Sequence, residues 1–275
     1  MLAIGIYLFC SYQWTWLSIW LGILMWFGGK KFQKNPKVIH FFQPVFQKGF
    51  NGIKIHRLIH LYANASGPFL YCFHPHGIVA NGFGVALHAV CENRPNVTVA
   101  VAKPLVWFNF AFRWFVNSYG CPLTSVACDD MRAVMARRTD LAICPGGFEE
   151  VMLMENDRDV VYLNHRTGFI KLAAQYGYTL VPIFAFGESD FYSNAIWLPR
   201  KISELLAHYG FPLVIPRGIS KWNFMPNKPA NGLVVVFGDP ISASGPNAHE
   251  EYISEIKRIH KTYRMPNYHR ELLVL

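Results

Sequence analysis

One stretch, FLYCFHPHG at residues 69–77, says most about the fold. Its first five residues are apolar and predict a strand buried on both faces. A rigid turn follows at once, because Pro75 restricts the backbone and Gly77 permits a tight turn and a close approach by a substrate. Open α/β sheets bind ligands just outside the carboxyl ends of their strands. The stretch therefore predicts that His74 and His76 stand where reactive groups are expected.

Short apolar strands alternate with helical patterns on either side of this stretch. Further strands are predicted at 97–102, 141–144, 179–186 and 232–237, and helices at 82–91, 108–118, 130–138, 168–176 and 250–263. This alternation predicts an α/β sheet with short loops at its edge. Since neither an internal repeat nor a low-complexity linker interrupts it, we expect a single domain at 66–275, preceded by a connector at 30–65.

The first 29 residues carry no charged side chain and end at Gly28-Gly29, before Lys30, Lys31 and Lys34. At about 1.5 Å of rise per helical residue, this run exceeds the roughly 20 residues that cross a bilayer. A cleaved signal peptide fits less well, because no basic region precedes the run and no small-residue cleavage site follows it. The sequence predicts a membrane anchor at 1–29, either one tilted span or a hairpin, with the lysines and the following domain facing the cytosol.

The composition agrees with a protein that works at a membrane. Hydrophobic residues make up 52% of the chain and charged residues only 16%, and the net charge is +9. A positive charge favours an anionic partner such as a leaflet or a phosphorylated substrate. The chain has no basic run joined to a nucleic-acid-binding motif, so we expect no nucleic acid among its partners.

The cysteines offer no recognisable framework. None of the six forms a CxxC pair or a short repeated spacing: Cys10, Cys72, Cys91, Cys121, Cys128 and Cys144. The sequence therefore predicts neither a zinc site nor a disulfide framework. A reducing compartment is the simpler expectation.

The two imidazoles of the HPHG turn admit three interpretations. They can act in catalysis, bind a metal or support the structure. No HExxH motif or Cys/His set completes a metal site, so the metal interpretation lacks ligands. Another apolar segment, at 106–116, is too short to span a bilayer and is interpreted either as the wall of an acyl groove or as an ordinary core helix.

Two further segments suit an anionic substrate. The segment CPGGFEE holds Gly146 and Gly147, whose N–H groups can face an anion, and Glu150, whose carboxylate can orient an imidazole. Arg166 and Lys171 stand near a predicted helix start and can bind phosphate. The plain alternatives are a turn before a solvated acidic helix and two surface cations on a helix.

Taken together, these segments resemble the diacylglycerol acyltransferase type 2 family, which includes monoacylglycerol and wax-ester-forming acyltransferases. The family pattern runs HPHG, GGxxE, RxGFxxLAxxxGxxLVPxxxFGE and GxPI. Here its parts stand in that order at 74–77, 146–150, 166–188 and 238–241. The resemblance covers about residues 66–265, and the long third block is its most specific part.

The resemblance implies a glycerolipid-acyltransferase-like α/β fold, a mixed sheet flanked by helices, behind the membrane anchor. It implies an acyl-CoA-dependent O-acyltransferase of the endoplasmic reticulum membrane, reaching lipid droplets, that esterifies a neutral lipid hydroxyl, with diacylglycerol as the leading acceptor. Acyl-CoA is then a co-substrate, and no cofactor or metal is expected. The expected partners are acyl-CoA, a lipid alcohol and membrane lipids, and a homo-oligomer is left open.

Roles for single residues follow from the same resemblance. The second histidine of the turn is the family's favoured base, which corresponds to His76, while His74 orients the turn or shares that role. The GGxxE carboxylate corresponds to Glu150, which we expect to fix the tautomer of the base. Substrate-binding positions are Pro75, Gly77, Gly146, Gly147, Arg166 and Lys171, the last two for the phosphates of coenzyme A.

One departure concerns the HxxxxD signature of the broader glycerolipid acyltransferases. Asn81 stands where that aspartate is expected, and a neutral amide cannot stabilise an imidazolium as a carboxylate can. A phosphate-bearing acceptor is therefore disfavoured. Monoacylglycerol, a wax alcohol and a lysophospholipid stay open as alternative acceptors, and a metal-dependent lipid hydrolase and a non-catalytic lipid-binding protein stay open as other functions.

Overall fold

The structure is a computed structural model that describes residues 52–56, 67–94, 96–103, 113, 116–117, 120–155, 157–196, 198–209, 213–218 and 226–275. The predicted anchor at 1–29 and most of the connector at 30–65 lie outside the described residues. Of the apolar segment at 106–116, only Arg113 and Val116 are described. No helix within the described part of the chain has the length and apolar character needed to cross a membrane.

The described elements alternate between strands and helices along the chain. The strands are β1 (Ile53–His56), β2 (Phe69–His74), β3 (Thr98–Val101), β4 (Leu123–Ser125), β5 (Leu141–Ile143), β6 (Arg158–Val161), β7 (Thr179–Phe186), β8 (Ser193–Asn194), β9 (Pro216–Arg217), β10 (Leu233–Phe237), β11 (Ile241–Ser242) and β12 (Glu271–Val274). The helices are α4 (Asn81–Asn93), α7 (Cys128–Met135), α8 (Gly147–Met152), α9 (Gly168–Gln175), α10 (Arg200–His208) and α11 (Ala248–Tyr263), with a 3-10 turn, η1 (Glu188–Asp190), after β7.

A mixed sheet forms the centre of the molecule. Its order is β1-β10-β7-β2-β5-β3-β4, and β11 also pairs with β7. The strands from β7 to β4 run parallel to their neighbours, whereas β10 is antiparallel to β7 and β1 is parallel to β10. The predicted mixed sheet is therefore confirmed.

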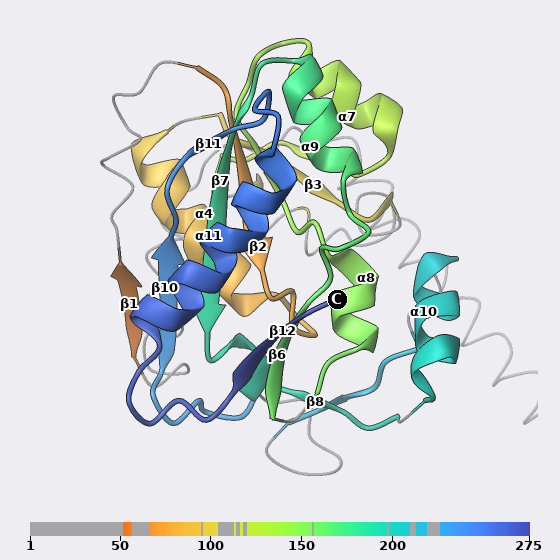
Figure 1. Cartoon of the computed structure of the whole chain (residues 1–275), viewed down its shortest axis with the longest axis vertical. Helices are drawn as coiled ribbons and strands as arrows, with labels where there is room; N and C mark the ends of the chain where they lie inside the picture. Colours follow the sequence, from red (N-terminus) through yellow and green to blue (C-terminus); the bar gives the residue numbers. More distant parts are fainter. Residues whose placement is uncertain are drawn as a thin grey trace, which may run out of the picture.

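Helices cover both faces of this sheet, which accounts for its nearly continuous apolar strands (Figure 1). Successive side chains of a strand point to opposite faces. In β2, Phe69, Tyr71 and Phe73 pack on the side of α4, while Leu70 and Cys72 pack on the side of α7, α9 and α11. This alternation also directs the last residue of β2, His74, toward α11.

The expected elements and the observed ones agree best at the centre of the sheet. The predicted strands correspond to β2, β3, β5, β7 and β10, and four of the predicted helices correspond to α4, α7, α9 and α11. The fifth, at 108–118, lies largely outside the described residues. The elements without a sequence prediction are the short strands at the edges of the sheet, the small two-stranded sheets, and the helices α8 and α10.

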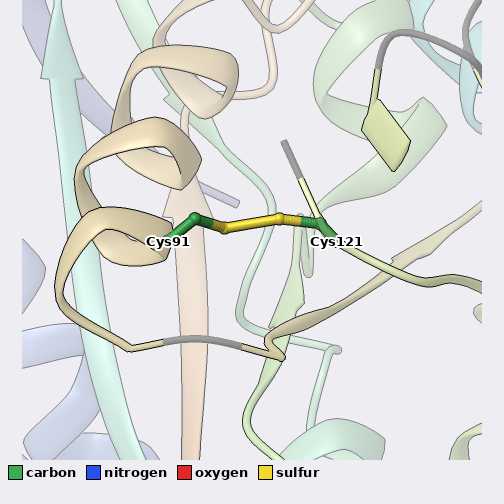
Figure 2. The surroundings of a disulfide bond; sticks show 2 residues. All are labelled: Cys91 and Cys121. Carbon is green, nitrogen blue, oxygen red and sulfur yellow. A yellow bond between two sulfur atoms is a disulfide. The ribbon is translucent and has the colours of Figure 1, made fainter. Parts of the chain in front are cut away.

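One disulfide corrects the expectation drawn from the cysteines. Cys91, near the end of α4, is bonded to Cys121, which lies two residues before β4, across a sequence separation of 30 (Figure 2). Both side chains are buried. Because the fold, and not local spacing, brings the end of α4 beside the start of β4, the sequence pattern carried no sign of this pair. A reducing compartment was expected because no disulfide was expected, and the Cys91–Cys121 bond removes that reason.

Candidate active site

Three turns meet at one edge of the sheet because of the strand order. β2 lies between β5 and β7 and runs parallel to both, so the carboxyl ends of all three strands share that edge. β2 ends at His74, β5 ends at Ile143 and β7 ends at Phe186. The HPHG turn, the CPGGFEE segment and the Gly187-Glu188 turn are consequently brought together from separate parts of the sequence.

His76 is the imidazole that faces a cavity. It is partly exposed and contributes to the cavity wall, and its Nδ1 lies 2.8 Å from the Gly77 carbonyl oxygen. A carbonyl oxygen only accepts hydrogen bonds, so Nδ1 carries the proton in the neutral ring. The Nε2 lone pair is then the basic one. This geometry suits a general base that works through Nε2.

Glu150 holds the turn through the main chain and not through the His76 imidazole. Its Oε2 accepts a hydrogen bond of 2.7 Å from the His76 backbone N–H, and its Oε1 accepts one of 3.1 Å from the Tyr162 backbone N–H. A third contact of 2.8 Å joins Oε1 to Nδ1 of His74. The carboxylate is 2% exposed. The expectation that Glu150 fixes the tautomer of His76 therefore differs from the structure, in which the Gly77 carbonyl has that position.

His74 is fully buried and is bonded through both ring nitrogens. Nδ1 contacts Glu150, and Nε2 lies 3.0 Å from the hydroxyl of Tyr252 on α11. With Glu150 ionised, Nδ1–H donates to the carboxylate and the Tyr252 hydroxyl donates to Nε2. Burial raises the pKa of the Tyr252 hydroxyl well above its ordinary value, which keeps it protonated as a donor. His74 has no free lone pair for a substrate proton or a metal ion, so its geometry fits a positioning role.

The glycines and the proline at the predicted site make room for these contacts. A Cβ at Gly146 would overlap the Glu150 carboxylate, and one at Gly77 would meet Glu188 while the backbone has a φ of +59°. Pro75 is buried between the two histidines, and the His74–Pro75 peptide bond is cis. The N–H of Gly147 donates to the Cys144 carbonyl at 3.2 Å, so in this state it is engaged in the turn and does not face an anion.

A second buried carboxylate, Glu188, lies under the HPHG turn and was not expected as a site residue. It accepts hydrogen bonds of 3.0 Å from the N–H of Asn81 and 2.6 Å from the N–H of Gly82, the first two residues of α4. Glu188 thus caps α4 from the end of β7, because the α4 N-cap has no side-chain hydrogen bond of its own. Burial outweighs these bonds and raises the pKa of Glu188 to about 8.

A cavity of about 1140 Å³ opens beside His76. The described part of its wall is largely apolar and comes from β1, β3, β5, α4, α7, α8, α9 and α10, with Val116 from the predicted groove segment. Small-ligand sites typically measure about 300–1,000 Å³. The cavity has room for a long apolar chain next to the base.

The two predicted phosphate-binding cations differ in position. Arg166 lines the cavity, forms an ion pair with the buried carboxylate of Glu149 and stacks over Tyr162, 5.7 Å from the ring centre. Lys171 is exposed on α9, whose cavity-lining residues within the described part of the chain are Gly168, Phe169 and Leu172. The structure therefore brings Arg166 to the site and leaves Lys171 outside the cavity wall.

Three residues complete the site although they were not predicted as site residues from the sequence. Tyr252 and Tyr162 come from α11 and from the residue after β6, and only the tertiary fold brings them to His74 and Glu150. Glu188 does stand at the end of the quoted family block, so its place after an apolar strand was the available signal.

Comparison with known proteins identifies relatives along almost the whole chain. The diacylglycerol acyltransferase family model matches residues 6–269. Diacylglycerol O-acyltransferase 2 of Xenopus tropicalis is 25% identical over 288 residues, which cover 95% of this chain and 76% of the relative. The human protein of the same name is 27% identical over 273 residues, covering 87% and 66%. Diacylglycerol O-acyltransferase 1 of Saccharomyces cerevisiae is 31% identical over 225 residues, covering 71% and 52%.

The residues matched by the family model include the three turns that converge on His76, Glu150 and Glu188. The family model extends over the whole sheet and the helices on both of its faces. The chain belongs to the diacylglycerol acyltransferase family.

Proposed function

We propose that this chain transfers a fatty-acyl group from coenzyme A to the free hydroxyl of diacylglycerol and so makes triacylglycerol. The observation that carries the proposal is an imidazole, His76, with its Nε2 available as a base in the wall of a large apolar cavity. The names of the relatives support diacylglycerol as the acceptor.

The reaction is a direct transfer. His76 Nε2 takes the proton of the acceptor hydroxyl while that oxygen attacks the thioester carbonyl carbon. The tetrahedral intermediate then breaks its C–S bond, and the imidazolium returns the proton to the departing thiolate, so the products are an ester and free coenzyme A. General-base assistance of this kind contributes about 10²- to 10⁴-fold in rate.

Glu150 and His74 act on the base through the backbone. The three hydrogen bonds that Glu150 accepts tie the HPHG turn to β6 and, through His74, to α11. A base held in one position raises the rate because the reacting atoms meet without further loss of orientational freedom. Glu150 is therefore proposed as a positioning residue that keeps the His76 ring at the cavity wall.

Arg166 is the cation we propose for the phosphates of coenzyme A. Its guanidinium is bound to Glu149 in this state, so a phosphate has to replace or join that carboxylate. Arg166 retains a buried Nε that has no hydrogen-bond partner among the described residues. An incoming anion can satisfy this donor, which favours binding at this place.

We place the reaction at the endoplasmic reticulum membrane and at lipid droplets. The apolar run at 1–29 and the following lysines support a membrane anchor with the site on the cytosolic side. Protease protection of intact microsomes tests this orientation, because a cytosolic domain is digested without detergent. Alkylation of the same membranes before and after reduction reports whether Cys91 and Cys121 are paired in that compartment.

The decisive experiment supplies radiolabelled acyl-CoA and a mixture of lipid acceptors to membranes of a host that lacks neutral lipids and expresses this chain. Labelled triacylglycerol as the main ester supports the proposal. A monoacylglycerol product, a wax ester or an acylated lysophospholipid instead identifies another acceptor. Absence of any acyl-CoA-dependent ester, with the protein present and folded, removes the enzyme interpretation and favours lipid binding without turnover.

A further inference from the structure

The helix α10 exposes an apolar stripe that the interior of the protein does not use. Ile202, Leu205 and Tyr209 are 46%, 56% and 68% exposed. Their spacing of three and four residues places them on one side of a helical turn. We call these three residues the α10 stripe.

The same helix has a separate inner face and a separate polar face. Ser203 and Ala207 are buried where α10 packs beside α8 (Figure 1). Arg200, Lys201 and Glu204 lie between the inner face and the α10 stripe on the helical wheel. A helix that only packed against its own protein would need one apolar face, and α10 has a second one.

Further exposed apolar side chains follow the helix. Leu213 and Ile215 are each 48% exposed. Scattered single apolar residues are ordinary on a protein surface, but a stripe continued by two more large aliphatic residues within ten positions marks an interaction surface.

The position of α10 relates this surface to the cavity. Ala207 and His208 line the cavity, while Leu205 of the same helix and Tyr209, its C-cap residue, are exposed. One side of α10 therefore forms a wall of the cavity beside His76, and another side is free to contact a partner.

We propose that the α10 stripe, continued by Leu213 and Ile215, docks into the surface of a lipid bilayer and sets the cavity against it. The choice of a lipid surface rests on the proposed function, because both the acceptor and the acyl chain are held in a bilayer. Lys201 lies next to the stripe on the helical wheel, and its cation suits the phosphate groups of lipid heads, whereas Arg200 lies toward the inner face and pairs with Glu204.

A second copy of the chain fits the same surface less well. Stable protein interfaces bury about 800 Å² on each partner and involve about 20–30 residues a side. Five side chains on one short helix and the segment after it fall far below that size. A bilayer needs only a narrow apolar stripe with flanking charge, which α10 provides.

The test uses the full chain in lipid nanodiscs, with an environment-sensitive fluorescent amino acid encoded at position 205. Lipids that carry a doxyl quencher on the acyl chain should quench this fluorophore, and the same fluorophore at the exposed Ser254 of α11 should stay unquenched. Site-resolved quenching is required because the predicted anchor at 1–29 would hold any variant at a membrane. A fluorophore at 205 that is shielded from water but untouched by the quencher would show that protein covers the stripe, and the proposal would be wrong.

Substitution gives a second, independent readout. Leu205→Asp should raise the apparent KM for diacylglycerol presented in a bilayer at least about tenfold, the factor that ~1.4 kcal/mol of lost apolar contact corresponds to. The rate with a short-chain diacylglycerol dispersed in water should stay the same, and Ser254→Asp should change neither value.

The two substrates separate the two proposals. If the docking proposal is wrong, the wild type is active on the water-dispersed substrate, and Leu205→Asp does not change the KM for the bilayer substrate. Failure of the proposed function leaves the wild type inactive on both substrates, whereas the quenching experiment, which needs no turnover, still reports on docking.

Discussion

The two histidines of the HPHG turn are two residues apart and lie in opposite surroundings. His74 is the last residue of β2 and is fully buried, with both ring nitrogens bonded to Glu150 and Tyr252. His76 stands within the turn and lies in the cavity wall, where Nδ1 contacts the Gly77 carbonyl and Nε2 has no partner among the described residues. The HPHG motif thus supplies a positioning residue, His74, and a base, His76.

This difference follows from where β2 ends. While the chain is still a strand, side chains alternate between the two faces, and the alternation places His74 against α11. Beyond Pro75 the backbone turns, and the alternation no longer applies to His76. Two histidines in one motif can therefore have different roles. A substitution of the base should mainly lower the rate, and a substitution among the buried residues that hold the turn should also lower stability.

The largest effect is expected at the base. His76→Ala should lower kcat by about 10²- to 10⁴-fold, because it removes the imidazole whose Nε2 takes the proton from the acceptor hydroxyl. Initial rates with acyl-CoA and diacylglycerol in isolated membranes measure this. The melting temperature should stay close to that of the wild type, since His76 is partly exposed. Retention of most of the activity by a folded, membrane-bound His76→Ala protein would refute the assignment.

A smaller effect is expected at the carboxylate that holds the turn. Glu150→Gln puts an amide NH₂ where three donors now meet a carboxylate, so we expect a loss of about 1–3 kcal/mol in unfolding free energy and up to about 10²-fold in kcat. Chemical denaturation and initial rates give the two numbers.

The neighbouring Glu149→Gln is the matched control. It removes a partner of Arg166 but leaves the contacts of Glu150 with the HPHG turn in place, so the loss of kcat should be smaller than that of Glu150→Gln. If Glu149→Gln costs more activity than Glu150→Gln, the positioning carboxylate has been misidentified by one residue.

The sequence predicts the centre of this molecule better than its periphery, for a physical reason. β2, β7 and β10 are buried on both faces, so their apolar runs are long enough to recognise. β4 and β11 have three and two residues, too few for a pattern, and α10 mixes apolar residues on an outer face with apolar residues on an inner one. Periodicity cannot separate two apolar faces on one short helix.

The same reason separates the site residues that the sequence indicated from those that it did not. His76 and Glu150 could be singled out because each stands in a motif that follows an apolar strand, while their roles were expected from the family resemblance. Tyr252 could not, since it stands in an ordinary amphipathic helix about 180 residues away and only the sheet order brings it to His74. The pairing of Cys91 with Cys121 was missed for the same reason.

Tyr252→Phe should remove the hydrogen bond that holds His74 in place and leave the contacts of the base, His76, unchanged. It leaves Nε2 of His74 buried without a donor, so we expect a loss of about 1–3 kcal/mol in unfolding free energy and a several-fold loss in kcat. The pH profile of kcat/KM should keep its shape, because the substitution leaves the base, His76, and its contacts in place. A displaced profile would mean that the Tyr252–His74 pair takes part in proton transfer, which the buried geometry argues against. Tyr263→Phe, on the same helix, is the control for loss of a hydroxyl.

At Glu188 the expected effect concerns stability, and the change in rate is expected to be the smallest. The folded protein holds a proton on Glu188 up to a pKa of about 8, whereas an unfolded glutamate loses it near 4.5. Between these pH values the folded state binds more protons, so the unfolding free energy contributed by this group is present below pH 4.5 and is lost as the pH rises through 8. Glu188→Gln cannot ionise and should flatten that slope in melting temperatures measured from pH 5 to 8.

The direction of the Glu188 slope also decides which physical effect dominates under the HPHG turn. Burial favours the neutral acid, while the N–H groups of Asn81 and Gly82 and the α4 dipole favour the carboxylate. If the wild type instead gains stability relative to Glu188→Gln as the pH rises, the helix cap outweighs burial and Glu188 is ionised beside the site. A second negative charge near His76 would then help stabilise the imidazolium during transfer, the role for which the HxxxxD aspartate is missing at Asn81.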